Sequence, residues 1–177
     1  LEGCLMSLLA STYDELEIIL VLNGLRQERC LQIVEHWSWC SSRVQVICLE
    51  DNLGYGGGAN KGVERAQGEY LAILNDDVEC ESGWLEPIIA VMETQDDIGA
   101  CQPKVRSKCN PEHFDYAGAA GGMLDVLGYP FARGRVFWTV EEDHGVYDDE
   151  ADIFWASGAA VVVRRSAWDE VGGFDPL

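Results

Sequence analysis

The chain has 177 residues, with 12 Lys and Arg against 31 Asp and Glu, and its formal net charge is −19 at pH 7. This length suits one domain that buries a substantial core, and a hydrophobic content of 47% argues against disorder. The negative charge disfavours nucleic acid as a partner and direct electrostatic binding to anionic lipids. No apolar run approaches the roughly 18 residues of a transmembrane helix, and no basic segment followed by an apolar run predicts a signal peptide.

Residues 1–105 alternate between two apolar patterns. Helical spacing of apolar residues predicts helices at 1–11, 27–40, 58–68 and 82–95. Gly68 is the expected C-terminal cap of the third helix, and Ser82 the expected N-cap of the fourth. Continuous apolar runs rich in branched residues predict buried strands at 16–22, 43–49, 69–74 and 98–105. This rhythm predicts an α/β fold with a mostly parallel sheet and helices on its faces.

The rhythm breaks after about residue 105. Glycines, aromatic residues and acids dominate through residue 152, which indicates an irregular insertion or hairpin region over one edge of the sheet. Two strand-like runs within 152–165 are separated by Ser157 and Gly158, and residues 166–173 read as a short helix begun by Ser166. The chain begins within a helix pattern and stops in a Gly-Gly-Phe-Asp-Pro turn, so we expect it to be a piece of a longer protein.

Seven cysteines form an odd set without a Cys-x-x-Cys pair. Most lie in apolar runs such as RVQVICLE, where a free thiol packs as a small hydrophobic group. We therefore expect reduced, structural cysteines and a cytoplasmic location.

The glycine-rich segment 51–62 follows a predicted strand, and ligands of open α/β sheets bind beyond such strand ends. Gly54 and the run 56–58 let the backbone approach a ligand, and the next helix offers free N–H groups. The spacing fits neither a phosphate-binding P-loop nor the dinucleotide fingerprint. A flexible strand–helix connection is the alternative interpretation.

A second polar segment, LNDDVE, ends the strand at 69–74. If the strand continued, Asn75 and Asp77 would point to one side and Asp76 to the other. Such oxygen ligands can share a divalent cation, which would bridge to a diphosphate. The alternative is a solvated acidic turn.

Taken together, the string NLGYGGGANKGVERAQGEYLAILNDDVE resembles the donor-binding half of family 2 glycosyltransferases, and specifically their rhamnosyltransferase-like members. It matches an N-x-G-x-x-x-G-x-N-x-G stretch followed by a G-E-Y-[apolar]-L-[ND]-x-D segment with the metal-binding D-x-D signature. The matching positions are Asn52, Gly54, Gly58, Asn60, Gly62, Gly68, Glu69, Tyr70, Leu74, Asn75 and Asp77. Weaker matches at both ends extend the resemblance to nearly the whole chain.

The resemblance implies a GT-A fold with a mostly parallel central sheet, in a single domain truncated at both ends. Residues 1–105 would be its nucleotide-binding half and 106–177 its acceptor-side half. It also implies an inverting transferase that moves a sugar from a nucleotide-diphosphate donor to a glycan or lipid-linked acceptor in the synthesis of cell-surface polysaccharide. A carboxylate would deprotonate the acceptor hydroxyl, while a metal stabilises the departing diphosphate.

Site residues follow from the same resemblance. The implied nucleotide-sugar-binding residues are Asn23, Asn52, Gly54, Asn60, Lys61, Asn75, Asp76 and Asp77. Asp77 would hold Mg²⁺ or Mn²⁺ against the diphosphate, and Asp76 would lie near the ribose. Trp155, Ser157 and Gly158 would border the sugar and the acceptor. For Trp155, stacking on a sugar ring and packing in the core both stay open.

The chain also departs from the family pattern. The family's first strand has no counterpart before Leu1, and Leu22 stands where relatives carry an acid that contacts the nucleobase. The catalytic base of relatives comes from a Glu-Asp pair beyond the Gly-Gly-Phe-Asp turn, so we expect it beyond Leu177 and expect this piece alone to be inactive.

Two other functions compete with this one. A catalytically incomplete GT-A module that binds a nucleotide or a partner chain fits Leu22 and the missing base. A sugar nucleotidyltransferase would need a basic Gly-rich loop of the G-x-G-T-R-x type, which the sequence lacks. For the intact protein we expect a cytoplasmic enzyme, or one peripheral to the inner face of the membrane, with membrane association through parts outside this chain.

Overall fold

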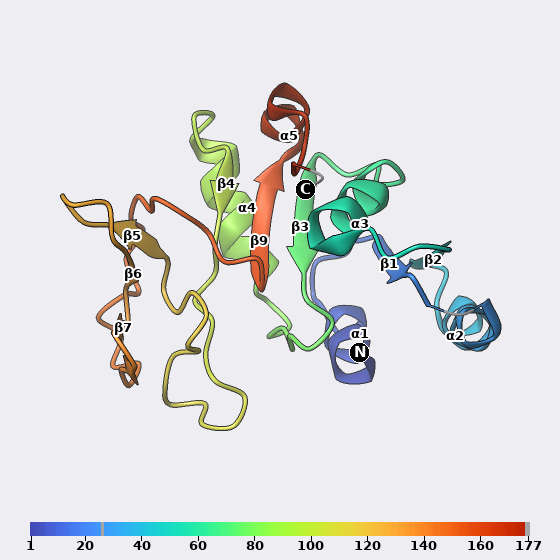
Figure 1. The fold of residues 1–177 in the computed structure, drawn as a ribbon, viewed down its shortest axis with the longest axis horizontal. Helices are drawn as coiled ribbons and strands as arrows, with labels where there is room; N and C mark the ends of the chain where they lie inside the picture. The colour runs from blue at the N-terminus through green and yellow to red at the C-terminus, as the bar shows by residue number, and fades with distance from the viewer. Residues whose placement is uncertain (26, 176–177) are drawn as a thin grey trace.

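The computed structural model describes residues 1–25 and 27–175 (Figure 1). The helices are α1 (Glu2–Leu9), α2 (Gln27–Cys40), α3 (Gly54–Val63), α4 (Leu85–Thr94) and α5 (Arg165–Val171). The strands are β1 (Ile18–Asn23), β2 (Val44–Leu49), β3 (Tyr70–Leu74), β4 (Ala100–Cys101), β5 (Gly122–Leu124), β6 (Pro130–Ala132), β7 (Arg135–Val136), β8 (Thr139–Val140) and β9 (Ala160–Arg164). The prediction of an α/β chain that becomes irregular after residue 105 is confirmed.

Within the described residues the strands form three separate sheets, with orders β1-β2, β3-β9-β4 and β5-β6-β7-β8. β1 and β2 pair in parallel from Ile18–Val44 to Asn23–Leu49. β9 runs antiparallel between β3 and β4. The prediction of a mostly parallel sheet is therefore not confirmed. β9, which comes late in the chain, lies between β3 and β4 and runs antiparallel to both.

A cavity of about 630 Å³ separates the first two sheets. Residues 17–21, which are the start of β1 and the residue before it, line one side. Residues 68–76, which are β3 and its neighbours on both sides, line the other. Within the described residues, β1 pairs only with β2, and β3 pairs only with β9, so both strands turn an unpaired edge toward this cavity. Asn23, Tyr55, Asn75 and Asp76 also belong to its lining.

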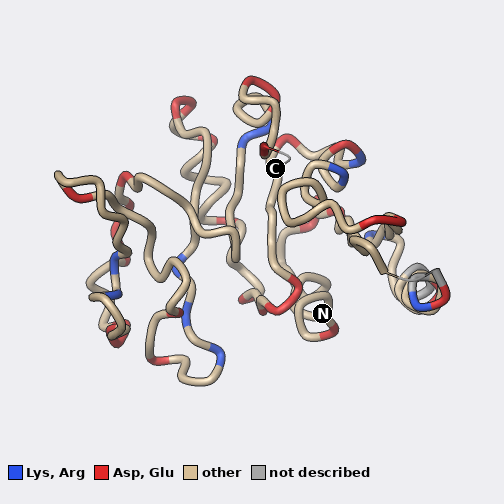
Figure 2. Tube along the Cα trace, in the orientation of Figure 1, with Lys and Arg blue, Asp and Glu red and all other residues tan. Residues whose placement is uncertain are grey.

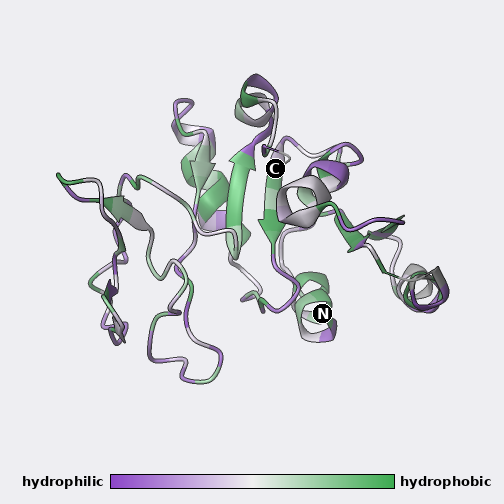
Figure 3. Ribbon diagram, viewed as in Figure 1, coloured by the Kyte–Doolittle hydropathy of each residue, from purple (hydrophilic) through white to green (hydrophobic). Residues whose placement is uncertain are grey.

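Apolar side chains hold these sheets to their helices. In the first cluster, α1 packs on β1, β2 and α2 through Cys4, Leu5, Leu8, Ile18, Trp37 and Val44. In the second, Leu85, Ile89 and Met92 place one face of α4 against Val162 of β9. The helical spacing of these three residues explains the contact, and Figure 3 shows how apolar the central strands are.

Several predicted boundaries shift. The glycine run is part of α3, which starts at Gly54 and ends at Val63, so Gly68 does not cap it. Glycine at position 58 lets α3 lie close to Asn23, because a Cβ on Gly58 would lie 2.9 Å from Asn23 Nδ2. The helices predicted to start at Ser82 and Ser166 instead have Trp84 and Arg164 at the N-cap. The strand predicted over 98–105 shortens to β4.

The region between β4 and β9 is an antiparallel meander, β5 to β8, with its own small core (Figure 1, left). Phe114 is 1% exposed and contacts the buried alanines 119, 120 and 132. A Cβ on Gly134, whose φ is +85°, would lie 2.5 Å from the Phe114 ring, so glycine is what admits the ring here.

Candidate functional site

Three segments that are distant in sequence meet at the end of β3. The Asn75 amide donates to the Ala159 carbonyl at 3.0 Å, continuing the pairing of β3 with β9. The Tyr55 hydroxyl, in the first turn of α3, donates to the Gly158 carbonyl at 2.6 Å. Partial burial raises the pKa of the Tyr55 phenol, so it stays a donor at neutral pH. The start of α3, the segment after β3 and residues 157–159 therefore form one site.

Two asparagine side chains shape the start of α3. Asn23 Oδ1 accepts a hydrogen bond from the Leu53 amide, and its Nδ2 donates to the Gly54 carbonyl, both at 2.8 Å. Asn52 Oδ1 accepts from the Gly54 amide at 2.9 Å. Gly54 has φ +71°, which an L side chain rarely adopts. Asn23, Asn52 and Gly54 thus fix how the helix begins.

The carboxylates after β3 divide into two kinds. Asp76 and Asp77 are exposed, and neither makes a hydrogen bond or ion pair with any residue in the described ranges. Glu79, by contrast, binds Lys108 Nζ at 2.5 Å, and Glu81 binds Arg106. Because β3 ends at Leu74 and a turn follows, the alternation expected for a continuing strand does not apply.

The carboxylates left free are suited to a cation that is shared with a ligand. No group of three or more His, Cys, Asp or Glu side chains within the described residues could hold a metal by itself. Mg²⁺, however, is usually bound through one or two carboxylates together with phosphate oxygens and waters. Asp76 and Asp77 fit that second arrangement.

Two thiols lie under the Asn75 segment. Cys4 Sγ donates to the Asn75 carbonyl at 3.6 Å, and burial raises the pKa of Cys4. Burial also raises the pKa of Cys80 to about 12. Both groups are therefore neutral at pH 7, and they add no charge beneath Asp76 and Asp77. Cys4, Cys40, Cys80, Cys101 and Cys109 are free thiols, which agrees with the prediction of reduced cysteines.

On the opposite side, Ser157 is a structural link. Its amide donates to Gln102 Oε1 at 2.6 Å, and its hydroxyl donates to the Ala117 carbonyl at 2.7 Å while accepting from the Ala159 amide at 3.1 Å. Ser157 as a whole is 8% exposed, so these hydrogen bonds are made in the interior. The sequence did not single out Gln102, since an isolated glutamine after a short strand carries no recognisable pattern.

Trp155 faces the meander. Its indole Nε1 donates to the Met123 carbonyl at 3.1 Å, and a Cβ on Gly122 would lie 1.9 Å from the Trp155 ring. These contacts agree with packing, the second of the two roles left open for this residue.

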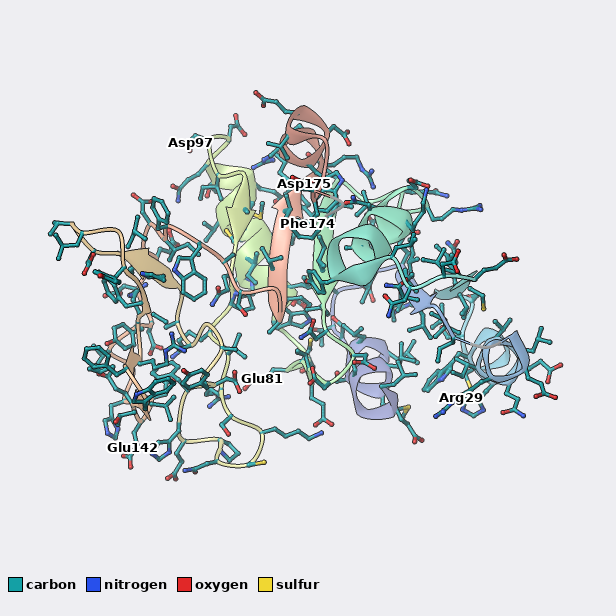
Figure 4. All side chains as sticks on the ribbon, viewed as in Figure 1. Arg29, Glu81, Asp97, Glu142, Phe174 and Asp175 are labelled. Carbon is teal, nitrogen blue, oxygen red and sulfur yellow. The ribbon has the colours of Figure 1, made fainter. Side chains whose placement is uncertain are left out.

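The C-terminal turn closes over α3. Asn60 Nδ2 donates to the Phe174 carbonyl at 2.8 Å, and Asn60 Oδ1 accepts from the Phe174 amide at 3.0 Å. The Phe174 ring, labelled in Figure 4, lies 5.8 Å from the Tyr55 ring and 4.9 Å from the Trp168 ring by their centroids. Lys61, one position further, pairs with Glu64 at 2.6 Å on the exposed side of α3.

The structure thus gathers most, though not all, of the residues that the sequence nominated. It brings together Asn23, Asn52, Gly54, Asn75, Asp76, Asp77, Ser157 and Gly158. Asn60 joins the C-terminal turn, whereas Lys61 and Trp155 have partners elsewhere. Tyr55 was missed, and its only sequence signal is a single aromatic residue within a glycine run.

Comparison with known proteins gives a consistent result. The family described as "Glycosyl transferase family 2" matches residues 1–170. An N-acetylglucosaminyl-diphospho-decaprenol L-rhamnosyltransferase from Mycobacterium tuberculosis is 27% identical over 99% of this chain and 60% of its own length. The O-antigen biosynthesis protein RfbC from Myxococcus xanthus is 28% identical over 96% of this chain and 13% of its own. A glucosyl-dolichyl phosphate glucuronosyltransferase from Haloferax volcanii is 26% identical, with coverages of 96% and 49%.

Proposed function

Since the chain belongs to glycosyl transferase family 2, we propose that its site serves the transfer of a sugar, with inversion, from a nucleotide-diphosphate donor to a glycan or lipid-linked acceptor. Family membership implies the GT-A fold, and the α/β arrangement agrees with it. The chain spans at most 60% of the three relatives described above, so the activity of the whole protein is part of the proposal.

The donor diphosphate would lie over the end of β3. Asp77 would hold Mg²⁺ or Mn²⁺ against it, and Asp76 would face the ribose. The observation that carries this assignment is the difference between these two carboxylates and their neighbours Glu79 and Glu81, which are already paired with basic residues. Of these four carboxylates, Asp76 and Asp77 are the two without a basic partner among the described residues, and a cation bound there would supply charge to stabilise the departing diphosphate.

The start of α3 would support the nucleotide from the side. The N-terminus of a helix suits an anionic ligand, and Asn23 and Asn52 act as positioning residues because their side-chain oxygens accept from the Leu53 and Gly54 amides at the start of α3. Asn60 and Lys61 would line the outer part of this pocket, at the positions that the family motif gives them.

Residues 157–158 would border the transferred sugar and the acceptor, with Trp155 supporting them from behind. We assign no catalytic base among these residues. A lipid-linked acceptor is supported by two relatives, whose names specify a diphospho-decaprenol and a dolichyl phosphate. A role in surface polysaccharide is supported by the relative named for O-antigen biosynthesis. The proposed location is the cytoplasm or the inner membrane face.

A second candidate is a module that binds a nucleotide or a partner without transferring a sugar. Leu22 favours it, because this residue is 4% exposed in the core at the end of β1 and offers nothing to a nucleobase. Binding and transfer must therefore be measured separately.

Thermal unfolding with Mn²⁺ and UDP, dTDP or GDP tests the donor site. A ligand at about 100 times its dissociation constant adds about 2.7 kcal/mol, which for this length raises the midpoint by roughly 5–10 °C. We expect a metal-dependent shift with one nucleotide, lost in Asp77→Asn and kept in the control Glu79→Gln. A shift that Asp77→Asn retains would contradict the metal assignment, and no shift with any nucleotide would contradict the donor site.

A further inference from the structure

The outer edge of the meander carries an unusual number of exposed apolar side chains. Val126 is fully exposed, and Phe137 and Trp138 are each 85% exposed. We name as the hairpin patch the exposed residues Leu124, Val126, Leu127, Tyr129, Phe131, Val136, Phe137 and Trp138. In Figures 1 and 4 this segment forms the edge of the molecule opposite α2, with side chains projecting outward. Contiguous apolar exposure of this kind marks an interaction surface.

Several of these side chains lie in or next to the turns that connect the strands of the meander. Successive strands of the meander run in opposite directions; in Figure 1 the β5–β6 turn is the tip at the upper left, and β7 lies further down the same outer edge. Phe137, in the second turn, has φ +51°, a conformation that suits glycine or asparagine better than an aromatic residue. The turn itself does not require phenylalanine, and strain of this kind is typical of functional positions.

The charge of this edge differs from the rest of the chain. Residues 122–140 contain two arginines and one aspartate, whereas the whole chain carries a net charge of −19. The guanidinium groups of Arg133 and Arg135 lie over the rings of Tyr147 and Tyr116, at 4.9 and 4.3 Å, and neither pairs with a carboxylate in the described ranges. Asp125 is engaged, since it accepts hydrogen bonds from two amides of its own turn. Figure 2 shows acids near this edge as well, mainly in the segment that follows the meander, where residues 141–152 include seven Asp and Glu.

The chemistry of this edge matches the headgroup layer of a bilayer. Trp138 stacks on Tyr116 with ring centroids 6.3 Å apart and an interplanar angle of 6°, and Arg135 lies on the other partner of that stack. Aromatic rings beside an arginine, next to aliphatic side chains, are what an interfacial membrane contact uses. Within the described residues, no helix is both long enough and apolar enough to span a bilayer.

We propose that the hairpin patch binds the surface of a lipid bilayer, placing its exposed apolar side chains among the headgroups while the rest of the chain stays in water. This goes beyond the proposed transfer reaction, because vesicle binding needs neither donor nor acceptor. It also assigns a membrane contact to residues of this chain, whereas the sequence predicted membrane association only through parts outside it. Under the proposed function, such a contact would bring the site to the membrane that holds a lipid-linked acceptor.

The combination of an apolar contact with an acidic body gives a distinctive salt response. At low ionic strength the body is repelled by anionic lipids over a long range, since the Debye length is about 30 Å at 0.01 M and about 8 Å at 0.15 M. Binding to zwitterionic vesicles should change little with salt. Binding to vesicles with anionic lipid should rise with salt, the opposite of a polybasic protein.

Co-sedimentation with phosphatidylcholine vesicles tests the proposal. The double variant Leu127→Ser, Phe137→Asn removes two large exposed apolar groups and keeps a residue suited to the left-handed turn. We expect binding to weaken by about tenfold or more. The matched control is Leu31→Ser, Val171→Ser, which removes two exposed apolar groups, 55% and 75% exposed, from α2 and α5. It should bind as the unmodified chain does.

A second measurement does not depend on how the variants fold. Bromine-labelled lipids should quench part of the tryptophan fluorescence of the unmodified chain, and that part should be missing in Trp138→Phe. No sedimentation with any vesicle, equal loss in the control, or binding that strengthens as salt falls would each overturn the proposal. So would self-association through the patch, seen as a dimer by light scattering that the double variant abolishes, without vesicle binding.

Discussion

The α/β part, residues 1–101 and 159–175, and the hairpin region, residues 102–158, are stabilised in different ways. In the α/β part, long aliphatic and aromatic side chains of helices and strands form two clusters that run through several elements. In the hairpin region one buried phenylalanine, Phe114, is surrounded by alanines and by Gly134, which makes room for its ring. In the α/β part many residues share the core, so the effect of a single substitution is spread over them. In the hairpin region the core depends on a few close contacts.

The difference matters for function because each part supplies one side of the site. The α/β part supplies the start of α3 and the free carboxylates after β3. The hairpin region holds Ser157 from behind through Gln102 and Ala117. Damage to the hairpin region should therefore disturb the acceptor side first and leave the donor side in place.

The largest effect is expected from Phe114→Ala. Removing a phenylalanine that is 1% exposed should lower the free energy of unfolding of the hairpin region by about 3–5 kcal/mol. Hydrogen exchange should then speed up across residues 105–157 while β1, β2 and β3 stay protected. The control Phe154→Ala, at a position 68% exposed, should change little. Uniform loss of protection across both parts would contradict the separation of the two cores.

A smaller loss is expected from Gly122→Ala. The new Cβ would meet the Trp155 ring at 1.9 Å, so the indole must shift and its hydrogen bond to Met123 must lengthen or break. Overpacking of this kind costs about 1–3 kcal/mol, measured by denaturant unfolding. Gly83→Ala, where a Cβ meets nothing closer than 3.8 Å, is the control. An unchanged unfolding midpoint for Gly122→Ala would mean that Trp155 is not packed there.

Asn60→Ala tests a contact within the α/β part. Losing both hydrogen bonds to the Phe174 backbone should lower the free energy of unfolding by about 1–2 kcal/mol. Lys61→Ala is a neighbouring control, because its exposed ion pair with Glu64 contributes little. If Asn60→Ala weakened nucleotide binding while leaving stability intact, Asn60 would be a ligand contact and not a link to the turn.

The smallest effect concerns pH. The hydrogen bond from Lys104, at 2.7 Å, holds the pKa of Asp143 below its ordinary value. The ionised carboxylate therefore stabilises the fold above the unfolded-state pKa, and this contribution is lost as pH falls through the folded pKa. Asp143→Asn should lower the free energy of unfolding by about 1 kcal/mol at pH 7. On acidification its free energy of unfolding should fall less than that of the unmodified chain. Asp149→Asn is the control, and parallel pH profiles for all three proteins would contradict the pair.

The sequence predicted the α/β part better than the hairpin region, for a physical reason. The strands at 16–22, 43–49 and 69–74 and the helix at 27–40 were found because burial on both faces or on one stripe leaves a periodic pattern. The second run predicted within 152–165 corresponds to β9, but its antiparallel direction was not predicted, since the direction of a strand is set by the route of the chain before it. The meander strands, two or three residues long, are too short for any period to show.

The site was predicted in part for a related reason. The motif located Asn52, Gly54 and the Asn75–Asp77 segment, which the fold does bring to one place. It could not indicate that Asn23 and Asn60 would be bound to backbone groups, or that Tyr55 would reach Gly158, because these contacts join segments 30 to 114 residues apart. Motif spacing reports local geometry, and long-range contacts decide which of its polar groups stay free.

The central claim is that Asp77 holds a divalent cation against a nucleotide diphosphate. Electron paramagnetic resonance of Mn²⁺, titrated into the chain with a saturating nucleoside diphosphate, measures that contact directly. The account predicts a protein-dependent loss of the signal of Mn²⁺ that is free or bound to nucleotide alone, with affinity about tenfold or more lower in Asp77→Asn and unchanged in Glu79→Gln. Equal binding of Mn²⁺ and nucleotide by the unmodified chain and by Asp77→Asn would contradict it.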